Sequence, residues 1–391
     1  MKKQSVLKSL SRDNQYLVRN FFIAYFVMGM YLILIGSALP EIKAEYQIDY
    51  QVGGMMLSVQ SVGYLVTGAF VGIVPRYLGA KRTYLILSNL AFLGLVLMMV
   101  TGNPVLLLLA MLMTGISKGS TCNFGNQFVS CLTNSDAGAL NLAQAFFAIG
   151  ACVAPMIAMV CGASWRMAFG IVVVCGVLNF VYSLRMKVGP EAYRQEQSGK
   201  PDFGFFRKTS FWLCAMIIFC YLAIESSVMG WLVTFFVDSG AAGEATAQLL
   251  ATALWGALLV GRFASAYLAQ RFRPDQMLAV MAVGIAACFT MLMVSRTLIP
   301  MTIGAIGLGL FMAGVYGTAI ANGGDLTERY PMCMGMYIAI PGIGATIAPS
   351  AVGTLADHIG IRGGMCVLYV LVALLLLVAA INLIYQKKRT D

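Results

Sequence analysis

Twelve stretches of about twenty mostly apolar residues follow one another along this 391-residue chain. A helix needs about this length to cross the hydrocarbon core of a bilayer, because each residue adds only about 1.5 Å. Hydrophobic residues make up 60% of the chain and charged residues 11%; soluble domains average roughly 45–50% and 25%. The sequence therefore predicts an all-α membrane protein with twelve transmembrane helices, at about residues 17–40, 50–75, 82–101, 105–131, 139–161, 165–184, 210–238, 243–270, 275–295, 299–322, 332–357 and 362–385.

The basic residues indicate how these helices are oriented. The chain has 26 Lys and Arg against 16 Asp and Glu, a formal net charge of +10. With the N-terminus inside, 20 of the 26 fall in cytoplasmic segments. Four fall in segments outside the cytoplasm, and two lie within spans. The four are Lys43, Arg166, Arg296 and Arg362, and the two are Lys118 and Arg262. Because Lys and Arg accumulate in cytoplasmic loops, this bias predicts a multi-pass inner-membrane protein with both termini in the cytoplasm. The same bias accounts for the charge without a nucleic-acid partner.

The longest polar interruption, residues 185–209, is rich in Gly, Pro and charge. Such a segment is typical of a boundary between domains. It predicts an N-terminal six-helix bundle over residues 1–184 and a C-terminal six-helix bundle over residues 210–391.

The two predicted bundles share an internal repeat. Residues 149–155 read IGACVAP, and residues 343–349, 194 positions later, read IGATIAP. The same offset relates Gly115 to Gly309, and an offset of 193 relates GYLVTGAF at residues 63–70 to GALLVGRF at residues 256–263. Each match joins a span to the span six places later, which indicates two pseudo-symmetric structural repeats.

Two six-helix repeats with a cytoplasmic linker resemble the plan of the major facilitator superfamily along the whole chain. LNLAQAF at residues 140–146, followed by IGACVAP, is similar to the LNLAQ-type signature of the fucose/galactose/glucose:proton symporter family. YLAIESSVMGWL and WGALLVGRF, beginning at Tyr221 and Trp255, resemble two less specific motifs of that family. The resemblance implies a monomeric secondary transporter that takes up a hexose by rocking its halves about a central site.

Two departures from the family pattern affect that expectation. The superfamily motif G-x-x-x-D-R-x-G-R-K/R survives after the second span as GIVPRYLGAKR, in which Arg76 stands where Asp is usual. Members of the symporter family commonly carry an acid in the fourth span, but GISKGSTCN here contains Lys118 and no acid. The charge relay at the cytoplasmic ends and the coupling to protons therefore stay open.

Carboxamide side chains are the first group of candidate site residues. An unpaired amide in hydrocarbon costs several kcal/mol, so these side chains should face protein or water. One face of the fourth span carries amides at a spacing of i, i+4 and i+11, and the fifth span begins with two more. Amides both donate and accept hydrogen bonds, as sugar hydroxyls do. The alternative is that they hold neighbouring helices together. The amides concerned are Asn123, Gln127, Asn134, Asn141 and Gln144.

Aromatic side chains are the second group, because a flat ring packs against the apolar face of a sugar. Gln60 lies one helical turn from one of these aromatic rings and joins the group. The alternative for each ring is a place in the core or against lipid. The candidates are Tyr25, Gln60, Tyr64, Tyr221, Trp255, Tyr316 and Tyr337.

Three ionisable residues lie inside predicted spans: Lys118, Glu225 and Arg262. A charge near the bilayer centre costs about 2.5 kcal/mol or more, so each is a candidate for substrate or ion coupling. Glu225 is the one carboxylate among them and the candidate proton carrier. Lys118 either pairs with an acid, with Glu225 or Asp136 as candidates, or extends toward the cytoplasmic interface. For Arg262 the alternative is a structural pairing with a helix C-terminus.

Prolines and glycines in the fifth and eleventh spans predict bending. Pro155 and Pro349 stand at equivalent positions of the two repeats and predict breaks in their helices. Pro341, together with Gly342 and Gly344, predicts a hinge in the eleventh span.

The sequence contains no H-E-x-x-H, G-x-x-x-x-G-K-[ST] or G-x-S-x-G motif. These absences argue against a protease, an ATP-driven pump and a hydrolase, so no enzyme activity, cofactor or metal is expected. Export of drugs or metabolites, transport of an anionic sugar derivative, and ligand sensing without translocation remain as alternatives to sugar uptake.

Overall fold

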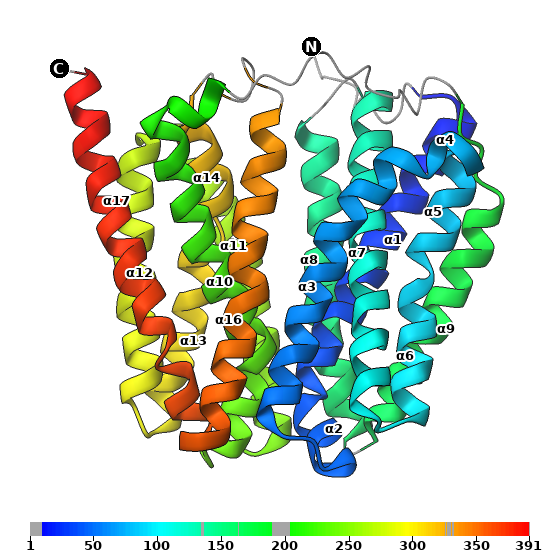
Figure 1. The fold of residues 1–391 in the computed structure, drawn as a ribbon, viewed down its shortest axis with the longest axis horizontal. Helices are drawn as coiled ribbons and strands as arrows, with labels where there is room; N and C mark the ends of the chain where they lie inside the picture. The colour runs from blue at the N-terminus through cyan, green and yellow to red at the C-terminus, as the bar shows by residue number, and fades with distance from the viewer. Residues whose placement is uncertain are drawn as a thin grey trace. The chain divides into compact units, whose positions relative to one another are not determined.

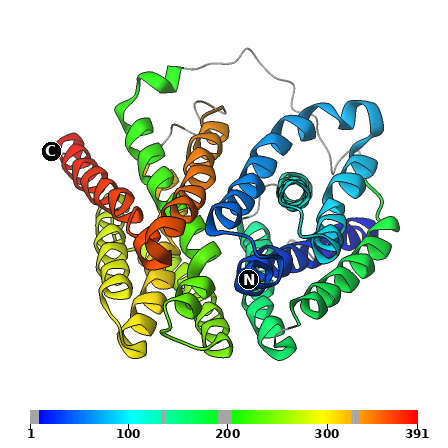
Figure 2. The same cartoon turned by 60° about the horizontal axis from the view of Figure 1, so that its bottom comes forward.

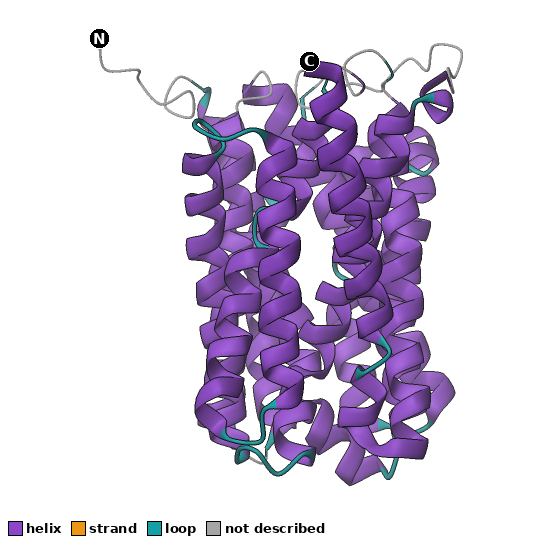
Figure 3. Cartoon of the chain, turned by 90° about the vertical axis from the view of Figure 1, so that its left-hand side faces the viewer, coloured by secondary structure: helices purple, strands orange, loops and turns teal. Residues whose placement is uncertain are grey.

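The computed structural model describes residues 10–133, 137–162, 164–189, 204–324, 326, 330 and 332–390. The regular structure in these residues is helical throughout, with no strand among them (Figure 3). Contacts divide the chain into an N-terminal unit, Met1–Ile48 and Val59–Gln197, and a C-terminal unit, Asp49–Ser58 and Ser198–Asp391.

Helices α1 to α9 run largely along one direction (Figure 1), and they belong to the N-terminal unit except for residues 50–58 of α3, which belong to the C-terminal unit. Helix α1 packs most extensively against α8, and α6 against α7. Their bounds are α1 Arg12–Ser37, α2 Leu39–Tyr46, α3 Tyr50–Ile73, α4 Pro75–Leu78, α5 Ala80–Ser88, α6 Leu90–Val100, α7 Pro104–Thr133, α8 Ala137–Cys161 and α9 Trp165–Leu184.

In the C-terminal unit, α10 packs against α16 and α17, and α13 packs against α11 and α12. The bounds of the described helices are η2 Gly204–Arg207, α10 Thr209–Asp238, α11 Glu244–Leu268, α12 Pro274–Val294, α13 Leu298–Met312, α14 Val315–Asn322, α16 Met332–Met365 and α17 Leu368–Thr390.

Eleven helical segments of the described chain are long and apolar enough to cross a bilayer. Helix α3, with 24 residues, lies where the second span was predicted. The third and tenth predicted spans are each divided into two helices, at Asn89 and at Ala313 with Gly314, although these residues keep right-handed helical dihedrals. At the first break, Ser117 Oγ donates a hydrogen bond to the Ser88 carbonyl, so this backbone oxygen keeps a partner away from water.

The predicted breaks at the prolines were wrong. Pro155 lies inside the continuous helix α8, and Pro341 and Pro349 lie inside α16. The missing N–H of Pro349 leaves the Ala345 carbonyl without its helical donor, and Ser226 Oγ on α10 approaches that oxygen at 3.4 Å. The same hydroxyl lies nearer, at 3.2 Å, to the Ala223 carbonyl of its own helix.

Non-helical backbone in α16 occurs instead at Ile359 and Gly360. Gly360 has φ of 74°, a left-handed conformation that favours glycine. This kink falls in the short interval predicted between the eleventh and twelfth spans.

The repeat seen in the sequence recurs as equivalent contacts within each unit. Gly150 of α8 packs against the Phe26 carbonyl of α1, and Gly344 of α16 packs against the Phe219 carbonyl of α10. A Cβ at Gly150 would collide with that carbonyl oxygen, whereas a Cβ at Gly344 would lie 3.0 Å from its carbonyl oxygen in a tight contact. Both helix pairs thus approach closely at a glycine.

An arginine near the sixth span of each repeat caps the helix of the third span. Arg166 Nε donates to the Met99 carbonyl at 2.8 Å, and Arg362 Nη1 donates to the Met293 carbonyl at 2.8 Å. Both carbonyls lie in the last turn of their helices, where a cation is favourable. These two arginines were predicted to lie outside the cytoplasm, and their equivalent contacts support the repeat independently of the glycines.

Arg166 also holds a carboxylate. Its guanidinium pairs with Glu45, which accepts a further hydrogen bond from Trp165 Nε1 at 2.7 Å. The hydrogen bond from Arg166 is the main reason that the pKa of Glu45 is lowered from its ordinary value.

The first turn of α3 is fixed by acidic side chains of the C-terminal unit. The backbone N–H groups of Tyr50 and Gln51 donate to the two carboxylate oxygens of Asp357, each at 2.8 Å. The Tyr50 phenol donates to Asp238 Oδ2 at 2.6 Å. Asp357 thereby caps a helix N-terminus, whose free N–H groups and positive dipole end favour a carboxylate.

Candidate functional site

Helix α7 carries much of the polar candidate site of the N-terminal unit. In Figure 2 it is seen nearly end-on among the other helices of that unit. Tyr25 on α1 is fully buried, and its hydroxyl donates to Asn126 Oδ1 on α7 at 2.8 Å. Asn126 itself is exposed, and its amide nitrogen makes no hydrogen bond with another described residue. The contact fixes the orientation of Asn126 while leaving its two N–H donors available.

The predicted pair on α3 contacts the same helix. Gln60 Nε2 donates to Thr114 Oγ1 at 3.0 Å, and Thr114 in turn donates to the Met111 carbonyl. One turn further along α3, the Tyr64 ring lies 4.9 Å from Lys118 Nζ. This is a cation–π contact, which is worth more where the cation is shielded from water. Lys118 makes no ion pair with Glu225 or any other described carboxylate, and Asp136, its other predicted partner, lies outside the described residues.

The remaining amides of this unit differ in their surroundings. Asn123 Nδ2 donates to the Gly119 carbonyl of its own helix at 2.8 Å. Gln127 and Gln144 are both half-buried, and Gln144 makes no hydrogen bond with a described residue. The Asn141 side chain and the whole of Asn134 lie outside the described residues.

In the C-terminal unit, the Tyr221 hydroxyl donates to Glu225 Oε1 at 2.7 Å, one turn along α10. Tyr221 is 5% exposed and Glu225 is half-buried. Arg262 on α11 and Tyr316 on α14 lie within electrostatic range of the same phenol. Arg262 forms no ion pair with a carboxylate that the structure describes. The arrangement gathers one carboxylate, one guanidinium and two phenols within the unit.

Trp255 and Tyr337 are buried, as are Tyr25 and Tyr221. Trp255 is 6% exposed on α11. Tyr337 is 0% exposed, and its ring stacks on Phe211 with centroids 5.1 Å apart. The burial of Tyr337 favours the packing role that the sequence left open for each aromatic residue.

Sequence reasoning missed two polar contacts. Asn126 was outside the face drawn through Asn123 and Gln127, although it lies one turn from both Cys122 and Ser130. Asn322 Nδ2 on α14 donates at 2.9 Å to Oδ1 of Asn382, which is fully buried on α17. Both contacts could have been suspected from the sequence, because each involves an asparagine inside an apolar span, where a polar side chain needs a partner.

The basic loop after α3 is solvent-facing. Arg76, which stands where the superfamily motif has an acid, is exposed on α4 and makes no ion pair with a described residue. Among the described residues, no group of three or more His, Cys, Asp or Glu could hold a metal ion.

Residues 21–329 match the family model described as Major Facilitator Superfamily. The chain belongs to this superfamily. The predicted twelve-helix fold is thereby confirmed. The solved structure of a bacterial homolog of the human lysosomal transporter Spinster has a TM-score of 0.79 at 12% identity, covering 97% of this chain and 98% of that one. The nucleoside transporter NupG gives a TM-score of 0.72 at 16% identity over 95% of this chain and 98% of its own.

The resemblance to sugar symporters is also confirmed. This superfamily member is 23% identical to a glucose/galactose transporter of Brucella abortus over 378 residues, 90% of this chain and 91% of that protein. A solved structure of a variant of the E. coli fucose:proton symporter FucP has a TM-score of 0.63 at 18% identity, covering 95% of this chain and 99% of its own. A mouse relative, major facilitator superfamily domain-containing protein 4A, is 28% identical over 114 residues, 29% of this chain and 22% of the mouse protein.

Proposed function

We propose that this transporter takes up a hexose or a closely related polar solute by alternating access. The observation that carries the proposal is the polar face of α7, where Asn126 is oriented by Tyr25 and presents its N–H donors. Gln60 and Gln144 add half-buried amides to the same unit. Such groups match sugar hydroxyls, which donate and accept hydrogen bonds. The glucose/galactose and fucose transporters among the relatives support this substrate class.

Glu225 is the proposed site of proton coupling. It is a half-buried carboxylate in a span, and the Tyr221 hydroxyl fixes its position. A carboxylate that gains and releases a proton as water access alternates couples transport to a pH gradient.

A second candidate substrate is an anionic sugar derivative, such as a sugar acid. Lys118 favours it, because this lysine has no carboxylate partner among the described residues and rests on the Tyr64 ring. The amides would then bind the hydroxyls and Lys118 the carboxylate.

We also propose that the protein is a monomer of the inner membrane with both termini in the cytoplasm, in two bundles over residues 1–184 and 210–391. The distribution of Lys and Arg supports the orientation. Cysteine labelling from each side of the membrane tests it.

Uptake into proteoliposomes tests the function. Purified protein is reconstituted and given labelled glucose, galactose, fucose and gluconate, with and without an inward proton gradient. Saturable, gradient-driven accumulation of a neutral sugar is the expected result. Equilibration of the sugar that does not respond to the proton gradient would exclude proton coupling. A preference for gluconate would support the anionic sugar derivative as the substrate. No saturable uptake of any of the four would overturn the substrate class.

A further inference from the structure

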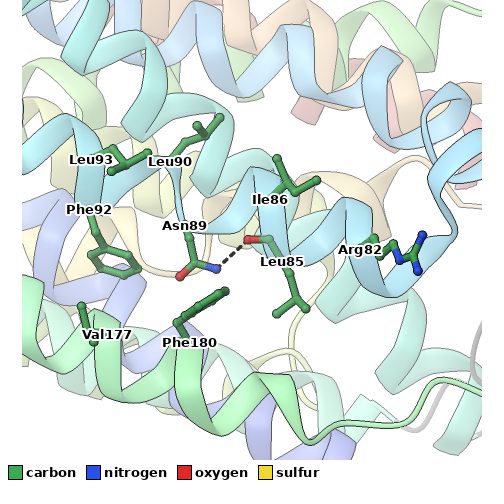
Figure 4. A pocket seen from close by; sticks show the side chains of 9 residues that line it. All are labelled: Arg82, Leu85, Ile86, Asn89, Leu90, Phe92, Leu93, Val177 and Phe180. Carbon is green, nitrogen blue, oxygen red and sulfur yellow. Dashed lines mark hydrogen bonds between the residues drawn. The ribbon is translucent and has the colours of Figure 1, made fainter.

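An apolar groove runs along the outer side of the N-terminal unit, between α5–α6 and α9. Its volume is about 550 Å³, and Figure 4 shows the side chains around it. Arg82 lies at one end of the row, whereas Phe92 and Leu93 lie at the other. Val177 and Phe180 of α9 form the opposite wall.

The break between α5 and α6 borders the groove at its middle. Asn89 separates the two helices, and its Nδ2 donates to the Leu85 carbonyl at 2.7 Å. One N–H of Asn89 is therefore paired with α5, and apart from Asn89 and Arg82 the side chains that line the groove are apolar. The Phe92 ring packs against Gly176 of α9, where a side chain would collide with it. This contact joins α6 to α9 at the end of the groove away from Arg82 (Figure 4).

The groove faces outward and has the length of one leaflet. Ile86, Leu93 and Val177 are 55%, 61% and 51% exposed, as expected of side chains that face lipid. From Arg82 to Leu93 the helical rise amounts to about 16 Å. Half the hydrocarbon thickness of a bilayer is about 15 Å. A single acyl chain entering from one membrane surface would therefore reach the far end of the groove.

Positive charge gathers at one end of the groove only. Arg82 is exposed and makes no ion pair with a described residue. Lys81 Nζ donates to the Leu184 carbonyl at 2.8 Å, which brings the start of α5 to the end of α9. Arg185 follows directly and is also exposed. Because Arg76 replaces the usual acid of this loop, no carboxylate of the motif neutralises these charges.

We propose that this groove binds an anionic phospholipid. One acyl chain lies between α5–α6 and α9, and the phosphate pairs with Arg82, flanked by Lys81 and Arg185. Arginine suits this role, because its planar guanidinium pairs with two phosphate oxygens at once. The basic residues at one end of the groove favour an anionic headgroup. The length of the groove matches an acyl chain that spans one leaflet.

Thermal stability in detergent tests the proposal. The full-length protein is titrated with dioleoyl phosphatidylglycerol or dioleoyl phosphatidylcholine, which share their tails, and unfolding is followed by tryptophan fluorescence. Phosphatidylglycerol should raise the Tm at lower concentration than phosphatidylcholine. Arg82→Gln should raise the phosphatidylglycerol concentration needed for half the effect about fivefold, the factor equivalent to about 1 kcal/mol per basic residue near an anionic surface. Glycerol phosphate, which has no tail, should give no shift.

Two further variants separate the groove from general surface charge. Arg271→Gln removes an exposed arginine that does not border the groove, and it should leave the lipid response unchanged. Val177→Phe adds bulk to the wall of the groove and should weaken the response to phosphatidylglycerol severalfold while the charges stay. Equal effects of Arg82→Gln and Arg271→Gln, equal responses to the two lipids, or an unchanged response in Val177→Phe would each overturn the proposal.

Discussion

The phenol of Tyr221 donates a 2.7 Å hydrogen bond to Oε1 of Glu225, so one turn of α10 carries a carboxylate in a fixed position. Glu225→Gln keeps an acceptor at this place but removes the titratable group. If Glu225 carries the proton, this variant loses accumulation against a gradient and retains exchange of labelled substrate across the membrane. Counterflow and gradient-driven uptake in proteoliposomes measure exchange and accumulation separately. Intact accumulation in Glu225→Gln would exclude Glu225 as the group that carries the proton.

Tyr221→Phe removes only the hydrogen bond. A hydrogen bond to a charged group contributes about 1.5–3 kcal/mol. We therefore expect kcat/KM for gradient-driven uptake to fall about tenfold to a hundredfold. Tyr267→Phe, which alters an exposed tyrosine of α11, is the matched control and should leave the rate unchanged.

The contact of Lys118 with the Tyr64 ring predicts a difference between two substitutions of the same tyrosine. Tyr64→Phe keeps an aromatic face under the ammonium group, whereas Tyr64→Leu removes it. Because such contacts are worth about 0.5–2 kcal/mol, substrate affinity should fall about twofold to thirtyfold further in Tyr64→Leu. Binding measured by calorimetry checks this, and equal affinities of the two variants would show that the ring does not act through Lys118.

The packing of Gly150 against the Phe26 carbonyl predicts a large cost for one methyl group. Gly150→Ala should lower the free energy of unfolding by about 1–3 kcal/mol. Its Cβ collides with a backbone carbonyl, which cannot move away by a rotamer change as a side chain can. Gly170→Ala in α9 is the control, since a Cβ there meets nothing within 4 Å. It should be neutral or stabilise by up to about 1 kcal/mol, as alanine favours helix. Comparable Tm values of the two variants would contradict the close approach of α1 and α8.

The lowered pKa of Glu45 predicts an acid-dependent loss of stability. A carboxyl group whose pKa is depressed in the folded state contributes stability above its ordinary pKa of about 4.3. That contribution disappears as the pH falls through the folded-state value. The Tm of the wild type should therefore decline more steeply than that of Glu45→Gln between pH 5 and about pH 3. Glu244→Gln, a control at the start of α11, should follow the wild type; parallel curves for wild type and Glu45→Gln would refute the role of Arg166.

The fold was largely predictable because hydrocarbon imposes simple rules on a sequence. Apolar length located the spans, and the 194-residue offset paired Gly150 with Gly344, which the structure shows in equivalent contacts. The interruption at Asn89 was not predicted, because one polar pair, Ser88 and Asn89, in an otherwise apolar stretch does not by itself mark a helix end. At this position the Ser88 carbonyl accepts a hydrogen bond from Ser117 Oγ of α7, and such a contact between helices cannot be read from spacing along the chain.

The candidate site was predictable in residue type more than in geometry. Helical spacing placed Gln60 one turn from Tyr64, and both do contact α7 or its side chains. Spacing could not reveal that Asn126 pairs with Tyr25, because that contact depends on the rotation of α1 against α7. It also could not distinguish the buried Tyr337 from a tyrosine in a cavity, since the same side chain suits both.

The capped start of α3 limits how the polypeptide could be divided. Cutting the central linker would give a second fragment with all of α10 and α16 but without Tyr50 and Gln51. The carboxylates of Asp238 and Asp357 would then lose the donors that they hold in the intact chain. A split form of this transporter should accordingly assemble best when residues 49–58 are present in solution with the second fragment, even as a short synthetic peptide.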